Sequence, residues 1–143
     1  MSTATAKAWK ALLARAGFFW CALPLRQVRQ VLSAPKVYPL PGAADVVSGL
    51  AEVDGEPVVV LSLERLVKAP EGPGAEFPVI LLVALDPANP GETLGLAVDE
   101  IGDLVGIDEE RVVGPSRGPI RGEMQLGEQV VRVLDLRDLG SAA

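Results

Sequence analysis

The two halves of this chain repeat one pattern of residues at a constant spacing. The repeated blocks, each displaced by 73 residues, are Ala22–Val28 with Gly95–Ile101, Gly49 with Gly122, and Leu61–Leu66 with Leu134–Leu139. Since three separate blocks share one offset, we interpret the chain as two copies of one structural unit. A unit of roughly 70 residues buries only about 60% of its unfolded surface, so the two copies should share a core.

Short apolar segments bounded by Gly and Pro predict strands connected by turns. The expected strands cover residues 11–16, 18–23, 46–51, 57–61, 79–85, 93–98, 120–126 and 129–134. Segment 79–85 is apolar throughout, which predicts burial on both of its faces. The Asp54-Gly55 pair between two apolar segments predicts a tight hairpin turn. Many short strands with few long helices favour a small barrel or a sandwich.

Helices are expected only as short pieces. The apolar spacing in residues 25–32 predicts a helix of about two turns. Ser62 is the expected N-cap of a single helical turn, and residues 135–139 are expected to form another. For residues 5–16 a helix is the alternative to a strand, because Ala, Lys and Leu are good helix formers. Residues 99–105 and 108–112 are expected to be short elements of mixed type.

The expected domain organisation is one compact unit with short ends. A flexible lead-in covers residues 1–9, a single domain made of two internally similar subdomains covers 10–140, and a tail covers 141–143. Hydrophobic residues make up 49% of the 143 positions and aromatic residues 4%. The core should therefore consist largely of Val, Leu, Ile and Ala.

Charge and hydropathy exclude several classes of partner. The net charge is −6, whereas a nucleic-acid-binding domain needs a basic surface. The same charge disfavours anionic membrane surfaces. The longest apolar segment is too short to cross a bilayer, and the N-terminus has no signal-peptide pattern. We expect a cytoplasmic protein that neither binds nucleic acid nor inserts into the membrane.

The residues that carry most enzyme chemistry are missing. The chain has no histidine, which removes the commonest general base and metal ligand. Its one cysteine, Cys21, has no such base to activate it, so we interpret it as a small half-buried strand residue. The acidic residues between Asp99 and Glu110 lack the ligand spacing of a calcium loop and are interpreted as a solvated face. We expect no catalytic residue, no metal and no cofactor.

In their order along the chain, several blocks resemble the CheW family of chemotaxis coupling proteins. The blocks that carry the resemblance are residues 22–32, 38–41, 48–63, 95–101 and 133–139, within a match that spans roughly residues 10 to 140. The resemblance implies two intertwined five-stranded SH3-like β-barrels that share a core, without catalytic activity. It also implies two partners, namely the cytoplasmic tip of a chemoreceptor (a methyl-accepting protein) and the regulatory domain of a CheA-type histidine kinase.

The same resemblance implies which residues contact these partners. Val28, Gln30, Asp54 and the neighbouring Gly55 occupy positions that face the partner-binding surface in the family. Each also has a simpler interpretation: Val28 as core packing, Gln30 as a solvated side chain, and Asp54 with Gly55 as a turn. Where the family usually has Arg, this chain has Asp54, which reverses the charge by two units.

The leading hypothesis is therefore a non-enzymatic adaptor between chemoreceptors and a CheA-type kinase. The Asp54 reversal and the shortened segment between Val112 and Ile120 motivate an alternative, an accessory CheW-like protein of a gliding or twitching pathway that binds receptors but not the kinase. A small ligand-binding β-barrel is a further alternative, and a deep, apolar, enclosed pocket would favour it.

Overall fold

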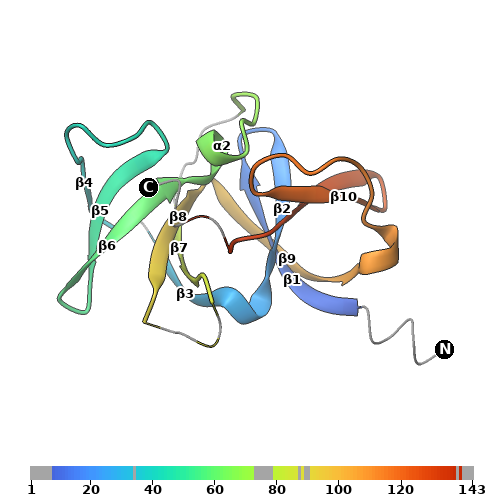
Figure 1. Ribbon diagram of the computed structural model, residues 1–143, viewed down its shortest axis with the longest axis horizontal. Coiled ribbons are helices and arrows are strands. Elements are labelled where there is room, and N and C mark those ends of the chain that lie inside the picture. Colours follow the sequence, from blue (N-terminus) through green and yellow to red (C-terminus); the bar gives the residue numbers. More distant parts are fainter. Residues whose placement is uncertain are drawn as a thin grey trace.

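The computed structural model describes residues 8–33, 35–72, 79–86, 88, 91–137 and 139, which form two β-sheets with short helical turns (Figure 1). The strands are β1 (Ala8–Ala16), β2 (Phe19–Pro24), β3 (Val28–Ser33), β4 (Val37–Tyr38), β5 (Val47–Val53), β6 (Glu56–Ser62), β7 (Val79–Ala84), β8 (Thr93–Val98), β9 (Glu100–Asp108), β10 (Ile120–Leu126) and β11 (Gln129–Leu134). The helical turns are η1 (Leu25–Gln27), α2 (Leu63–Leu66) and η2 (Glu109–Arg111).

Each sheet takes strands from both halves of the chain. The first sheet has the order β10-β11-β2-β1-β9, and the second has the order β3-β7-β8-β6-β5-β4. When the second sheet is followed from its other end, β5, β6, β8, β7 and β3 match β10, β11, β2, β1 and β9 in turn. The predicted all-β fold of two intertwined, similar strand assemblies is confirmed, and β4 makes the second sheet one strand larger than expected.

Two parallel strand pairs join the halves. In the first sheet β11 runs parallel to β2, with Val133 opposite Ala22. In the second sheet β6 runs parallel to β8, with Val60 opposite Gly95. The two registers are related by the 73-residue offset of the sequence repeat, so the repeat describes strand pairing as well as composition.

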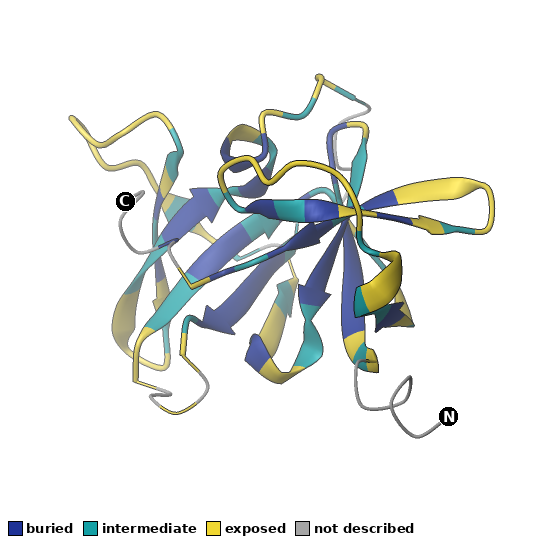
Figure 2. Ribbon diagram, turned by 45° about the vertical axis from the view of Figure 1, so that its right-hand side comes forward, coloured by how far each residue is buried: buried dark blue, intermediate teal, exposed yellow. Residues whose placement is uncertain are grey.

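The buried residues form one shared core and one smaller core on each sheet. The shared core combines side chains of both sheets, including Leu12 and Leu23 from the first and Leu61 and Leu96 from the second. A second cluster lies on the other face of the first sheet, and a third lies on the other face of the second. Figure 2 shows the inner strand segments buried and the hairpin loops exposed. The predicted sharing of a core and the predicted burial of both faces of β7 are confirmed.

Residues 25–32 are not the two-turn helix that their apolar spacing predicts. They form the single 3-10 turn η1, and the chain then continues as strand β3. β3 pairs with β7, with Val28 opposite Val83 and Val31 opposite Leu81. Pairing of β-branched residues against a buried strand outweighs a weak local helical preference.

Other local predictions have mixed outcomes. Residues 8–16 form β1, so the helix considered for 5–16 is wrong over the described part, and Ala8 and Trp9 belong to a strand. Residues 100–108 form the one long strand β9, where short mixed elements were expected. Residues 1–7 of the expected lead-in, the expected tail 141–143 and part of the helical turn at 135–139 lie outside the described residues.

Turn chemistry explains several boundaries. Asp54 and Gly55 have φ values of 52° and 82°, as a two-residue hairpin with both central residues left-handed requires. Ser62 accepts a hydrogen bond from the Arg65 N–H, which confirms it as the N-cap of α2. The repeated Gly49 lies against the strand that follows β3, since a Cβ there would be 2.2 Å from the Tyr38 carbonyl oxygen. Only glycine fits at that approach.

The shared core predicts that the chain unfolds as one unit. Leu61 and its counterpart Leu134 are both fully buried in that core. We expect Leu61→Ala and Leu134→Ala each to lower the free energy of unfolding by about 2–5 kcal/mol, because each leaves a cavity between the sheets. Urea unfolding followed by tryptophan fluorescence and by far-UV circular dichroism should give coincident transitions for both variants. Two separate transitions would contradict a shared core.

Candidate functional site

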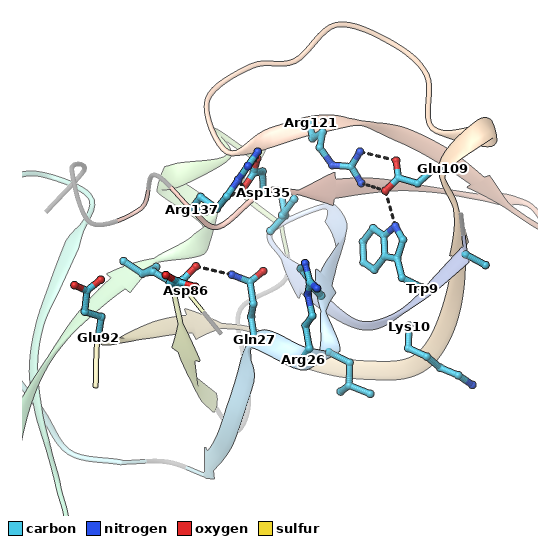
Figure 3. Close-up of a pocket in the computed structure, with 15 residues that line it drawn as sticks. Trp9, Lys10, Arg26, Gln27, Asp86, Glu92, Glu109, Arg121, Asp135 and Arg137 are labelled. Carbon is cyan, nitrogen blue, oxygen red and sulfur yellow. Dashed lines mark hydrogen bonds and ion pairs between the residues drawn. The ribbon is translucent and has the colours of Figure 1, made fainter. Parts of the chain in front are cut away.

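An open groove lies where segments from both halves of the chain meet (Figure 3). Its volume is about 1280 Å³. It is lined by Ala8, Trp9 and Lys10 of β1, by Pro24–Gln27, by Leu85, Asp86 and Glu92 between β7 and β8, by Glu109 of η2, by Arg121 of β10, and by Leu134, Asp135 and Arg137. Charged side chains make up about half of this lining. The groove is therefore neither the apolar nor the enclosed pocket that would favour a small ligand-binding barrel.

One wall of the groove is a hydrogen-bonded triad of Trp9, Glu109 and Arg121. Arg121 donates to both carboxylate oxygens of Glu109, each at 2.8 Å, and the Trp9 indole N–H donates to Glu109 Oε1 at 2.6 Å. The Arg121 guanidinium also lies over the Trp9 ring, 5.7 Å from its centroid. The Arg121 hydrogen bonds and the Trp9 hydrogen bond hold the Glu109 pKa below its usual value, against a smaller opposing effect of burial. Glu109 is therefore a fixed anion that orients two flat side chains.

The opposite part of the groove joins η1 to the end of β7. Gln27 is buried, and its amide donates to the backbone carbonyls of Ala84 at 3.2 Å and Leu85 at 2.8 Å. Next to it, Asp135 holds Arg137 through two parallel hydrogen bonds. These contacts with Arg137 keep the Asp135 pKa below its usual value. Pairs of this kind fix the shape of the groove and leave Lys10 and Arg26 without an ion-pair partner among the described residues.

The sequence-predicted contact residues lie in separate parts of the second sheet. Val28 and Gln30 are on β3, at one edge of that sheet, where Val28 is half-buried against the shared core and Gln30 is exposed. Asp54 and Gly55 form the exposed turn between β5 and β6, with β7 and β8 between them and β3 in the strand order. None of the four lines the large groove, although Val28 directly follows its lining residue Gln27.

The sequence analysis missed the groove because its parts are far apart along the chain. Trp9 and Glu109 are 100 residues apart, and no local pattern links them. Glu109 was instead grouped into a solvated acidic face, and this interpretation is wrong for several members of the group. Asp99 accepts from the Gly17 N–H and pairs with Arg15, and Glu100 also pairs with Arg15. A nearby aromatic–carboxylate–arginine combination was the one available signal.

The site offers binding surfaces, and its chemistry is limited to charge and hydrogen bonding. Cys21 is fully buried in β2, more deeply than the half-buried position expected, and burial raises its pKa to about 12. The thiol is therefore protonated and inaccessible at neutral pH. Over the described segments, no group of three or more potential ligand side chains is placed to hold a metal ion. In the same segments, no helix has the length and hydropathy needed to cross a membrane.

The Glu109 triad predicts a local change in acid. Because its folded pKa is lowered, the stabilisation from the ionised carboxylate is complete above the ordinary value of 4.5 and is lost as pH falls through the folded pKa. We expect the indole N–H resonance of Trp9 to shift with a midpoint below pH 4.5, and Glu109→Gln to abolish this shift. The Trp20 indole is the internal control. Equal titration of both indoles would contradict the assigned contact.

Comparison with known proteins agrees with this architecture. The family model described as "CheW-like domain" matches residues 10–143. The crystal structure of the scaffolding protein TtCheW from Thermoanaerobacter tengcongensis superposes with a TM-score of 0.77 at 17% sequence identity, covering 92% of this chain and 91% of that chain. No curated protein matches the sequence. The family match extends over nearly the whole chain, and the chain therefore belongs to the CheW-like domain family.

Proposed function

We propose that this chain is a non-enzymatic adaptor that couples chemoreceptor-type proteins to a CheA-type histidine kinase in the cytoplasm. The observation that carries the proposal is the CheW-like family match over residues 10–143. The similar fold of a protein described as a scaffolding protein supports it. A chain without histidine also lacks the phosphoacceptor that a kinase of this class would use on itself.

The surfaces available for this role are spread over the molecule, as an adaptor with two partners needs. The β3 edge presents Gln30 beside the half-buried Val28, and the β5–β6 turn presents Asp54 and Gly55. We propose these four residues as partner contacts. The charged groove lies next to the β3 site through Gln27, and its fixed ion pairs would favour a partner with complementary charges.

A second candidate is an accessory adaptor of a gliding or twitching pathway that binds receptors without the kinase. The observation that favours it is the charge at the β5–β6 turn, where an exposed Asp54 stands in place of the basic residue usual in the family. A kinase surface that is complementary to a basic residue would repel a carboxylate there.

The adaptor proposal predicts separable binding defects. The full chain should bind a chemoreceptor tip fragment and the regulatory domain of a CheA-type kinase in isothermal titration calorimetry. Gln30→Arg should weaken receptor binding by about tenfold, because it places a bulky charge on the β3 edge. Gln129→Arg makes the same change at an exposed position of β11 and is the matched control.

Binding to neither fragment would contradict the adaptor proposal. Binding to the receptor fragment alone would favour the accessory adaptor. Kinase binding of ordinary affinity would rule out that second candidate. Asp54→Asn keeps a residue that tolerates the left-handed turn and removes its charge. Any partner that contacts this turn should therefore show an altered salt dependence with this variant.

A further inference from the structure

The outer face of the β4–β5–β6 region carries a shallow apolar groove of about 240 Å³. Tyr38, Leu50 and Pro57 supply its apolar surface, and Glu52 and Gly55 border it. Tyr38 is 54% exposed although it is the largest side chain there. Small-molecule sites usually measure about 300–1,000 Å³, so this groove suits one or two side chains of a protein.

The sequence repeat provides an internal control for this surface. Leu50 pairs with Val59 across β5 and β6, and their counterparts in the other half, Glu123 and Arg132, pair across β10 and β11. Arg132 Nε lies 3.4 Å from Glu123 Oε2, and the Arg132 guanidinium is 3.8 Å from the centroid of the Phe19 ring. The second half therefore covers this face with its own charged side chains.

The counterpart of Tyr38 behaves in the same way. Arg111 stands 73 residues after Tyr38 and donates to the Gln125 backbone carbonyl at 2.8 Å, which ties it down across the strand edge. Tyr38 has only Lys36 beside its ring, 5.5 Å from the centroid. The same fold is thus stable with a polar, internally paired face, and the apolar groove of the first half is not a requirement of folding.

The rim of the groove is acidic. Glu52, Asp54 and Glu56 are all exposed at or next to the β5–β6 turn, and none has an ion-pair partner among the described residues. The corresponding positions of the β10–β11 hairpin are Gln125, Gly127 and Gln129, which carry no charge. The negative charge is therefore specific to the half that also carries the open apolar groove.

We propose that this groove docks a protein segment in which an aliphatic or aromatic side chain is flanked by Lys or Arg. The apolar side chain fills the space between Tyr38, Leu50 and Pro57, and the basic residues meet the acidic rim. The proposal rests on the proposed adaptor function and adds the chemistry of one partner. The contact is small, so we expect weak, salt-sensitive binding.

The test uses the full chain and a panel of 12-residue peptides. Each peptide has a central Leu, Ile, Val, Phe or Tyr with two Lys or Arg on each side, and a matched peptide has Glu in place of each basic residue. We expect at least one basic peptide to shift the backbone amide resonances of Tyr38, Leu50 and Gly55 and to lose affinity as salt is raised. The acidic peptides should leave these resonances unchanged.

Variants separate this surface from the rest of the molecule. The double change Glu52→Lys with Glu56→Lys should weaken the basic peptide by about tenfold or more, because it reverses two exposed charges. Glu128→Lys adds a charge at the tip of the other hairpin and should have no effect. Tyr38→Ala should also weaken binding, with Val130→Ala on β11 as its control. Amide dispersion verifies that each variant is folded.

Three results would overturn the proposal: no shift with any basic peptide at millimolar concentration, equal binding of acidic peptides, or equal shifts on the β10–β11 hairpin. Concentration-dependent shifts without peptide would instead assign the groove to a second copy of this chain and would also overturn it. Failure here together with receptor and kinase binding would leave the adaptor function standing. Peptide binding without receptor or kinase binding would do the reverse.

Discussion

The parallel pairing of β11 with β2 and of β6 with β8 is the constraint on which the rest of the structure depends. These pairs place the last strand of each half beside the second strand of the other half. Neither sheet is complete without residues from both halves, and the faces of the two sheets meet in the shared core. Because parallel strands need long connections, the repeat unit must be long enough to reach across, and its length is kept between the halves.

The charged groove is a direct consequence of this exchange. β1 pairs with β9, which ends at η2, and the first sheet also holds β10. Trp9, Glu109 and Arg121 therefore meet although two of them are 100 residues apart. Their charges are compensated within the wall, so the groove has a defined shape without an uncompensated buried charge. A surface of this kind suits recognition of a partner more than chemistry on a small substrate.

The two halves have kept their cores alike and have diverged on their surfaces. Buried Leu61 corresponds to buried Leu134, and buried Val60 to buried Val133. The outer faces differ, since Leu50 and Val59 correspond to Glu123 and Arg132. Packing density explains the first result, because a changed volume in a shared core costs several kcal/mol. A surface position carries no such cost, and its side chain is free to follow the needs of a partner.

The sequence by itself determined the repeat, the positions of most strands, the Asp54-Gly55 turn and the Ser62 cap, because these depend on periodicity and turn chemistry within a few residues. Only the tertiary structure decided that residues 25–32 form a turn and a strand, since pairing with β7 supplies contacts that local spacing does not reveal. It also decided the groove, because Glu109 acquires its role from Trp9 and Arg121, which lie in other strands. Long-range pairing, absent from any local window, is the physical reason for both differences.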